Sequence, residues 1–505
     1  MTKANDSVKS AAPELEETTV AELQAAMKSG QTSAREITRK YLDRTKEIDG
    51  KLNSVIETNP DAMKIAEESD KERKSGKVRG ALHGIPILIK DNIDTADRMK
   101  TTAGSLALVD APTPAKDAFL VQQLRNAGAI IIGKTNLSEW ANFRSSKSSS
   151  GWSGRGGQTR NPYILDRNPC GSSAGTGAAI AANLAAIGIG TETDGSILCP
   201  SATCGLVGIK PTLGLVSRSG VIPIAHSQDT AGPMTRTVSD AAILLGVLVG
   251  NDSSDAITSQ SSKGVKDYTK FLDKDGLRGQ RIGVARQIFG KNSKIDALIE
   301  PQLQVFKDGG ATLIDIEFPT FGKFGDAEFD VLLYEFKADL NKYLAGRGSR
   351  HKNLADLIRF NDENRDREMP YFGQEIFIMA EKKGNLTERA YRLALQKSKL
   401  LSQANGIDAV MSKNKLDAFI APSGGVAWMT DLVNGDCGVF EGMTSFAAVS
   451  GYPSITVPAG FIQNLPAGMS FFGRAFSEPT LIKIAYAYEQ ATKARRQPKF
   501  LATYL

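Results

Sequence analysis

The stretch from Cys170 to Pro200 reads CGSSAGTGAAIAANLAAIGIGTETDGSILCP. It joins a serine-rich loop to an alanine-rich helix expected over 178–185, a short apolar strand over 186–189 and a polar turn that ends at Ser196. A helix followed at once by a short apolar strand is typical of a protein in which helices cover a buried sheet. The stretch therefore predicts an α/β fold and places several serines at the ends of its elements.

The same alternation of helix and strand continues on both sides of this stretch. Upstream, residues 85–89 (IPILI) are expected to form a buried strand that runs directly into Lys90, and residues 129–132 form another. Downstream, strands are expected at 281–285, 311–316, 416–421 and 454–458, with a long helical segment over 330–405. Short apolar runs separated by helices are typical of sheets that are buried on both faces. We expect a single large mixed β-sheet core covered by helices on both faces.

The chain divides into a short tail and one large domain. Residues 1–16 are expected to form a flexible tail, and residues 17–505 form the domain. Residues 250–265, rich in serine, are expected to be a surface linker. The parts expected within the domain are N-terminal helices over 17–80, a catalytic core over 81–250, a more variable α/β part with a helical excursion over 266–415, and a return to the core over 416–505.

The bulk composition excludes several classes of protein. The 505 residues are 41% hydrophobic and 23% charged, as in ordinary soluble globular proteins. The net charge of +6 is the small excess of 62 basic over 56 acidic side chains, and the basic runs are short and mixed with polar residues. We therefore expect no nucleic-acid partner. No stretch has the ~20 apolar residues of a membrane span, and the N-terminus has no apolar run of signal-peptide length. We expect a cytoplasmic protein that does not bind membranes, although a removed secretory leader would leave no trace here.

The cysteines and histidines do not form a metal-binding pattern. The four cysteines contain no CxxC pair, and the three histidines are scattered at His83, His226 and His351. A structural zinc site needs clustered ligands of these types, so we expect no metal. Four cysteines in so long a chain do not suggest a disulfide scaffold either.

Two short motifs suggest other chemistry. Residues 128–135 (GAIIIGKT) match the phosphate loop GxxxxGK[ST], but the residues between the glycines are mostly strand formers, so a buried strand is the better interpretation. Residues 171–175 (GSSAG) match a nucleophile elbow centred on Ser173, which needs a downstream acid and histidine. His226 and His351 do follow it. However, His351 lies in a charged segment that is expected to be exposed, and His226 lies in a plain segment where a structural histidine is commoner.

The region around the quoted stretch resembles the amidase-signature family. The serine-rich loop, alanine-rich helix, buried strand and TDxGGS-like turn match the diagnostic stretch of that family. The likeness is dense over residues 17–250 and looser in the C-terminal third. Further matching segments are GIPILIKDN (84–92), GKTNLSE (133–139), GQTRNP (157–162), GLVGIKPT (205–212) and QDTAGPM (228–234).

The resemblance maps three catalytic groups onto this chain. It implies that Ser196 is the nucleophile, that Ser172 is a proton bridge preceded by a cis peptide bond, and that Lys90 is the base. A lysine acts as a base only when neutral, and burial can lower its ordinary pKa of ~10.4 by several units. Lys90 directly follows an apolar strand, which supplies that burial. The alternatives are that Lys90 reaches solvent, and that Ser172 and Ser173 cap the helix that follows them.

The turn before Ser196 offers consecutive backbone N–H groups after a buried strand. Such groups can stabilise the oxyanion of an acyl-transfer reaction, so we expect Thr193, Asp194 and Gly195 to bind substrate there. The carboxylate of Asp194, which stands at a usual glycine position of the family, must then point away from the oxyanion.

Other departures from the family pattern bear on the substrate. Cys170 and Ala174 replace common glycines without removing a catalytic group, and Leu198 stands where most members have arginine. Without that guanidinium, small free carboxylates become less suitable substrates and uncharged, amidated ends more suitable. The segments GWS (151–153), RGGQ (155–158) and CP (199–200) are most similar to the peptide amidase branch of the family, which removes C-terminal amide groups from peptides.

We therefore expect an amidohydrolase that acts on linear amides, C–N bonds other than peptide bonds. The expected substrate is a small-molecule or peptide amide, and the expected products are a carboxylate and ammonia. The resemblance implies that no cofactor is needed, and we expect a monomer or homodimer. The alternatives are the glutaminase-type subunit of a tRNA-dependent amidotransferase, which would need partner subunits, and a broad-specificity aliphatic or aryl amidase. A nucleotide-binding module, from another class, rests only on residues 128–135.

Overall fold

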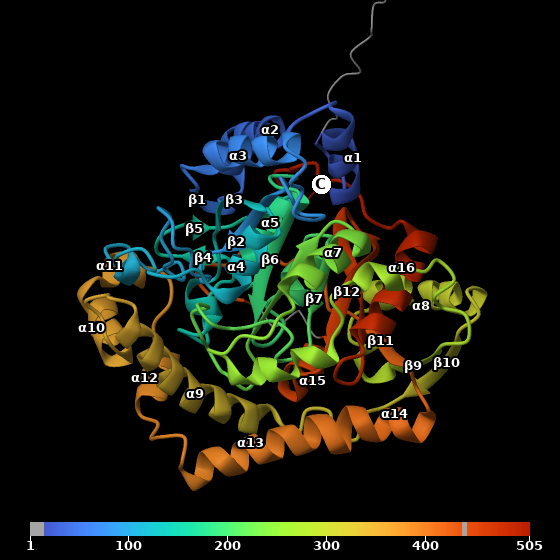
Figure 1. Cartoon of the computed structure of the whole chain (residues 1–505). Coiled ribbons are helices and arrows are strands. Elements are labelled where there is room, and N and C mark those ends of the chain that lie inside the picture. The colour runs from blue at the N-terminus through green and yellow to red at the C-terminus, as the bar shows by residue number, and fades with distance from the viewer. Residues whose placement is uncertain (1–14, 437–441, 505) are drawn as a thin grey trace, which may run out of the picture.

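Eleven strands form one mixed β-sheet with helices on both of its faces, as predicted (Figure 1). The computed structural model describes residues 15–436 and 442–504. The strands of the large sheet are β1 (Val55–Thr58), β2 (Pro86–Lys90), β3 (Ile130–Thr135), β6 (Ile187–Glu192), β7 (Val207–Lys210), β8 (Thr230–Thr235), β9 (Arg281–Ala285), β10 (Thr312–Ile316), β11 (Ala418–Pro422), β12 (Ser454–Ile462) and β13 (Leu465–Phe472). Their order across the sheet is β1-β3-β2-β6-β8-β7-β12-β13-β11-β9-β10. A separate hairpin pairs β4 (Trp152–Ser153) with β5 (Gly157–Gln158).

The strands that carry the quoted motifs lie side by side in the middle of one half of the sheet. β2 pairs in parallel with β3 on one side and with β6 on the other. Every residue of these three strands is buried, which explains why each strand begins with residues that carry no polar side chain instead of alternating apolar and polar residues. The strand β3 contains residues 130–135, so the phosphate-loop match is a buried strand, as expected.

The helices cover the sheet and extend along one edge of the molecule. They are α1 (Val20–Ser29), α2 (Ala34–Ile48), α3 (Ala62–Lys74), α4 (Phe119–Asn126), α5 (Ala174–Ala181), α6 (Leu198–Thr203), α7 (Val238–Leu248), α8 (Ser293–Asp308), α9 (Gly325–Gly346), α10 (Leu354–Glu363), α11 (Arg365–Glu368), α12 (Glu375–Glu381), α13 (Arg389–Ser402), α14 (Asp408–Asn414), α15 (Thr444–Ser450) and α16 (Glu478–Thr492). The predicted excursion over 330–405 is helical and comprises most of α9 to α13. The helices α9 and α13 run along the edge opposite α1 to α3, and α10 and α11 lie at the side of the molecule (Figure 1). In the described part of the chain, no helix combines the length and apolar character needed to span a membrane.

The helix α5 begins and ends earlier than the predicted 178–185. It starts at Ala174 and stops at Ala181, because the chain turns at Asn183, which has a left-handed φ of 58°. It packs very close to β6: a Cβ at Gly188 would lie 2.7 Å from side-chain atoms of Ile180 and Thr176. This close approach brings the start of α5, and the serine loop before it, next to the end of β6.

Two expectations about connecting segments are corrected. Residues 250–265 are not a plain surface linker, since Ala256–Lys263 form a 3₁₀ helix in which Thr258 and Ser261 are buried. The predicted tail ends before Leu15, because Leu15 is buried in the core and Glu16 forms an ion pair with Arg44. The rest of that tail, 1–14, lies outside the described residues, and the other predicted boundaries stay predictions.

Candidate active site

Lys90, Ser172 and Ser196 come together where β2 and β6 end. Lys90 is the last residue of β2, Ser196 lies in the turn that follows β6, and Ser172 lies just before α5. Because β2 and β6 are parallel neighbours, with Ile89 opposite Ile189, their carboxyl ends meet at the same edge of the sheet. Such an edge is where open α/β sheets usually hold their ligands.

Lys90 is completely buried and does not reach solvent. Its Nζ donates a hydrogen bond of 2.7 Å to Ser172 Oγ, and bonds of 2.8 and 3.3 Å to the hydroxyl and carbonyl oxygens of Thr191. Burial lowers the pKa of Lys90 to about 7, while the nearby carboxyls of Asp229 and Glu192 act in the opposite direction. Near neutral pH a large fraction of this amine is therefore uncharged and able to accept a proton.

The two serines of the loop have different surroundings. The peptide bond between Gly171 and Ser172 is cis, as the resemblance implies, and the hydroxyl of Ser172 accepts the bond from Lys90. The hydroxyl of Ser173 donates to Thr191 O at 3.1 Å and accepts from Thr191 N at 3.2 Å. Neither serine caps α5, because its N-cap residue, Ser173, makes no side-chain cap bond. His226 is hydrogen-bonded to Asp339. His351, which was expected to be exposed, is instead buried against the ring of Phe360. The geometry therefore does not support an elbow at Ser173.

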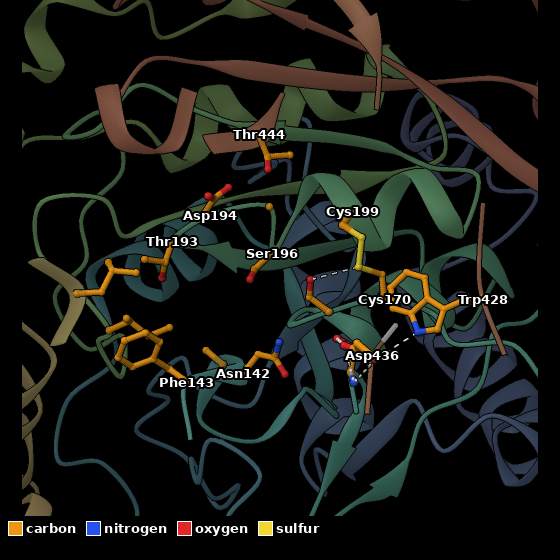
Figure 2. A pocket seen from close by; sticks show the side chains of 16 residues that line it. Asn142, Phe143, Cys170, Thr193, Asp194, Ser196, Cys199, Trp428, Asp436 and Thr444 are labelled. Carbon is orange, nitrogen blue, oxygen red and sulfur yellow. Dashed lines mark hydrogen bonds between the residues drawn. A yellow bond between two sulfur atoms is a disulfide. The ribbon is translucent and has the colours of Figure 1, made fainter. Parts of the chain in front are cut away.

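Ser196 opens into a cavity of about 390 Å³ (Figure 2). Its side chain is 8% exposed, and its carbonyl oxygen accepts a hydrogen bond of 3.2 Å from Ser173 N, which fastens the turn to the serine loop. The Ser196 hydroxyl makes no hydrogen bond with any described residue. It is therefore free to meet a group that enters the cavity.

The turn before Ser196 forms one wall of this cavity. Thr193, Asp194 and Gly195 all line it, as predicted for the substrate-binding turn. The N–H groups of Asp194, Gly195 and Ser196 donate to no other residue in 15–436 or 442–504. Gly195 has a φ of 76°, the left-handed conformation that glycine adopts most readily, and this turns the chain sharply. The turn thus offers unused donors at the place where a carbonyl oxygen beside Ser196 would lie.

Three polar residues that hold this arrangement were not singled out from the sequence. Glu192 is fully buried, and its Oε2 accepts hydrogen bonds from Ile197 N at 2.7 Å and Leu198 N at 3.0 Å. Asp229 accepts a bond of 2.6 Å from Thr193 Oγ1, and burial raises its pKa to about 6. Together with Thr191 they brace the turn from behind. Glu192 could have been noticed as the one charge at the end of an otherwise uncharged strand, and Asp229 lies in a quoted segment, QDTAGPM.

The carboxyl group of Asp194 is held away from the turn's amides. Its Oδ2 accepts a hydrogen bond of 2.5 Å from Ser445 Oγ, and it lies beside Thr444 (Figure 2). Glu328 is its other neighbour, and burial raises the pKa of both carboxyls, that of Glu328 well above its usual range. Two adjacent buried carboxyls of this kind are expected to share a proton. The glycine-to-aspartate departure is thereby accommodated without a charge facing the oxyanion site.

A disulfide bond joins Cys170 to Cys199, although the sequence did not suggest one. Both cysteines line the cavity, one just before the serine loop and the other in the first turn of α6 (Figure 2). They are 29 residues apart in the chain, and their Cα atoms come within 5.9 Å only because α5 returns the chain to the end of β6. The bond therefore cross-links the segments that carry Ser172 and Ser196.

Reduction of this bond is expected to destabilise the protein and lower its activity. A loop of 29 residues corresponds to about 3–4 kcal/mol in the chain-entropy account of disulfides. We expect the urea concentration at the unfolding midpoint of the wild type to fall when a reductant is added. The double variant Cys170→Ser, Cys199→Ser should have about the same lowered midpoint without reductant. Reductant should leave the double variant unchanged, which controls for the other thiols. An unchanged wild-type midpoint after full reduction would contradict this role.

The two sides of the cavity differ in character. Phe143 lies on one side, while Trp428 and Asp436, with Ser150 hydrogen-bonded to Asp436, lie on the other side near the disulfide (Figure 2). The apolar residues Ala141, Ile224 and Leu332 also line the cavity. None of the described residues that line it is a lysine, arginine or histidine. Leu332, Trp428 and Thr444 belong to the segments 330–405 and 422–445, so both of these segments contribute to the pocket.

One group of side chains has the composition of a metal site. His226, Glu335 and Asp339 offer ligand atoms within 4.8 Å of one another. The imidazole already pairs with both carboxylates, with Nδ1 2.8 Å from Asp339 and Nε2 3.4 Å from Glu335. These ion pairs account for the group without an ion, and it does not line the cavity of Ser196.

Comparisons with known proteins agree with this geometry. Residues 36–482 match the model of the Amidase family. The chain is 41% identical over 500 residues to a probable amidase of Arabidopsis thaliana, covering 97% of this chain and 92% of that protein. It is 35% identical over 505 residues to one component of the glutamyl-tRNA(Gln) amidotransferase of Thermoanaerobacter pseudethanolicus, covering 96% and 99%. The crystal structure of native peptide amidase from Stenotrophomonas maltophilia superposes with a TM-score of 0.93 at 50% identity, covering 96% of this chain and 99% of that one.

The family match, the relatives and the neighbouring structures all point to the same chemistry. The chain belongs to the amidase family and is a hydrolase of the amidase-signature kind that acts on amide C–N bonds.

Proposed function

We propose that this enzyme hydrolyses the C-terminal amides of peptides to a carboxylate and ammonia through an acyl-enzyme on Ser196. The observation that carries the proposal is the 2.7 Å hydrogen bond from a completely buried Lys90 amine to Ser172, beside a free Ser196 hydroxyl in a cavity. A serine hydroxyl needs an adjacent base to become a nucleophile, and an uncharged lysine is such a base.

In the proposed acylation step, Ser196 Oγ attacks the amide carbon and its proton passes to Ser172 Oγ, while the proton of Ser172 passes to Lys90 Nζ. The carbonyl oxygen becomes an oxyanion that the N–H groups of Asp194, Gly195 and Ser196 stabilise. Each well-placed donor of this kind contributes about 2.7–4 kcal/mol. The C–N bond then breaks as Lys90 returns its proton through Ser172 to the leaving nitrogen, which departs as ammonia. This leaves an ester on Ser196 and a neutral Lys90.

In the proposed deacylation step, water attacks the ester carbon and gives a proton to Ser172, which again passes one to Lys90. The Ser196 oxygen leaves and takes a proton back through the same two groups. The product is a carboxylic acid, and all three side chains return to their starting states. Every proton transfer uses this chain's own residues and needs no cofactor.

The character of the cavity supports an uncharged amidated end as the substrate. No basic side chain among the described lining residues is available to hold a free carboxylate. Leu198, at the position where most family members have arginine, is completely buried. The 50% identity to a native peptide amidase favours the same substrate class. A glutaminase role, as in the amidotransferase components that the chain also resembles, would require recognition of the α-carboxylate of glutamine.

A screen for ammonia release tests the proposed substrate class. The purified chain is expected to release ammonia from amidated peptides at least about 100-fold faster, in kcat/KM, than from free glutamine, since a buried charge without a partner costs several kcal/mol. Simple aliphatic and aryl amides serve as the comparison for a broad-specificity amidase. Equal rates on all amides would indicate such an enzyme, and a preference for glutamine would indicate the amidotransferase role.

The cellular location and the oligomeric state remain predictions from the sequence. We expect a cytoplasmic enzyme that is a monomer or homodimer. Disulfides are rare in cytosolic proteins, so the Cys170–Cys199 bond weighs toward an oxidising compartment. Cell fractionation and sedimentation of the purified protein would decide the two questions separately.

A further inference from the structure

Asp436 places a carboxylate in the cavity wall, and no positive side chain among the described residues neutralises it. Its oxygens accept hydrogen bonds from Ser150 N at 3.0 Å, Ser150 Oγ at 2.5 Å and Trp428 Nε1 at 3.3 Å, with the amide of Asn168 further away at 3.5 Å. All of these donors are neutral. Burial raises the pKa of Asp436 and the hydrogen bonds lower it, while no lysine, arginine or histidine of the described chain acts on it.

The other carboxyl in the cavity wall is already engaged. Asp194 accepts a hydrogen bond from Ser445 and lies against Glu328, with which it is expected to share a proton. Acidic side chains that lose part of their contact with water are stabilised by a positive partner. Asp436 is partly buried and has no such partner among the described residues, so its charge is left for whatever enters the cavity.

Trp428 adds an aromatic surface at the same place. Its indole N–H donates to Asp436, and both residues line the cavity on the side of the disulfide, while Phe143 lies on the opposite side of Ser196 (Figure 2). Indole rings attract ammonium and guanidinium groups. A carboxylate beside an indole, in a cavity whose described lining has no basic residues, is a combination suited to a cation.

We propose that Asp436 and Trp428 form a cation-binding subsite that selects amide substrates whose acyl part carries an ammonium or guanidinium group. This inference rests on the proposed amide hydrolysis at Ser196 and specifies its substrates further. The cation has two possible sources, the free α-amino group of a short peptide amide or the side chain of a lysine or arginine residue. Both would present the same charge to Asp436 while the amide carbon lies at Ser196.

Matched pairs of substrates test the proposal and separate the two sources. The first arm compares amino-acid, dipeptide and tripeptide amides with a free N-terminus against the same compounds with an acetylated N-terminus. The second arm compares N-acetylated peptide amides that contain lysine with their norleucine counterparts. We expect the kcat/KM of the wild type to be about tenfold higher for the cationic member of a pair. This preference should be seen for at least one peptide length in the first arm, or for the lysine and norleucine pairs of the second arm.

The variant Asp436→Asn keeps the shape of the side chain and removes its charge. It is expected to abolish the preference while still hydrolysing the neutral members. Asp431 lies on the same segment at the surface, and its carboxylate accepts hydrogen bonds only from residues of its own turn. Asp431→Asn is therefore the matched control, and it should keep both the activity and the preference for cationic substrates. If Asp436→Asn does not fold, inhibition of the wild type by butylamine is compared with inhibition by butanol. The amine should inhibit about tenfold more strongly.

Several results would overturn the proposal. Hydrolysis of peptide amides by the wild type without preference in any pair would do so and would leave the proposed function intact. An equal loss of activity by Asp436→Asn on cationic and neutral substrates would show that Asp436 only holds Ser150 and Trp428 in place. Equal inhibition by butylamine and butanol would also count against it. Failure to hydrolyse any peptide amide would remove the proposed function and this subsite with it.

Discussion

Replacing Ser196 with alanine is expected to lower ammonia release by about 10⁴-fold or more, because it removes the hydroxyl oxygen that is proposed to form the acyl-enzyme. The fold should be unaffected. The Ser196 hydroxyl makes no hydrogen bond within the described residues, so the free energy of unfolding should change by no more than about 0.5 kcal/mol. Steady-state ammonia release and urea unfolding measure the two effects, and mass spectrometry of the quenched reaction should detect an acylated wild type and no acylated variant.

Ser201 offers a matched control for this substitution. It lies in α6, shortly after Ser196, and its hydroxyl is completely buried without a hydrogen-bond partner among the described residues. Ser201→Ala is expected to retain nearly all of the wild-type activity. Substantial turnover by Ser196→Ala, or acylation of it at another residue, would show that the nucleophile has been assigned wrongly.

The activity is expected to fall on the acidic side as Lys90 takes up a proton. Burial lowers the pKa of Lys90 to about 7, so the neutral form that accepts a proton predominates above that pH and diminishes below it. In the free enzyme, kcat/KM should therefore be level above about pH 8 and fall about tenfold for each unit below 7, reaching about one hundredth of the plateau at pH 5. A rate that does not change between about pH 5 and pH 9 would count against a lysine base.

Two substitutions of Lys90 separate its basicity from its charge. Lys90→Met removes the amine and keeps a long side chain in the buried site, and it is expected to lower kcat/KM by about 10²–10⁴-fold. Lys90→Arg keeps a hydrogen-bond donor but carries a guanidinium that does not lose its proton in proteins, so it should be as inactive as Lys90→Met. Circular dichroism and urea unfolding establish that both variants are folded. Full activity in Lys90→Arg would mean that a cation, rather than a base, is needed beside Ser172.

The parts of the site that could be predicted from the sequence lie within short segments. An apolar run that ends in lysine predicts both the strand β2 and the burial of Lys90, because a strand covered on both faces admits few charges. The turn TDGS after a second such strand likewise predicts exposed backbone donors. The resemblance to a known family then assigned roles to Lys90, Ser172 and Ser196. These roles stay predictions, and the geometry described above supports them.

Contacts between distant segments of the chain could not be found in this way. Asp229, just before the strand β8, accepts a hydrogen bond from Thr193 in the turn after β6, and neither segment alone shows that the two meet. The Cys170–Cys199 bond was missed for the same reason, since the separation of two cysteines in the sequence does not reveal their distance in space. The boundaries of α5 were shifted because its packing against Gly188 of β6 outweighs the helical preference of the alanines that follow.

By itself, the sequence determined the class of fold, the strands next to the candidate catalytic groups and the family to which the enzyme belongs. These depend on apolar runs, turn residues and motifs that act over a few neighbouring positions. Only the tertiary structure decided which polar groups surround the cavity: the neighbouring carboxyls of Asp194 and Glu328, the disulfide, and Asp436 beside Trp428, with no positive partner among the described residues. These depend on which distant segments the sheet and its covering helices bring into contact, and charge and burial at such a meeting point are properties of the packed molecule.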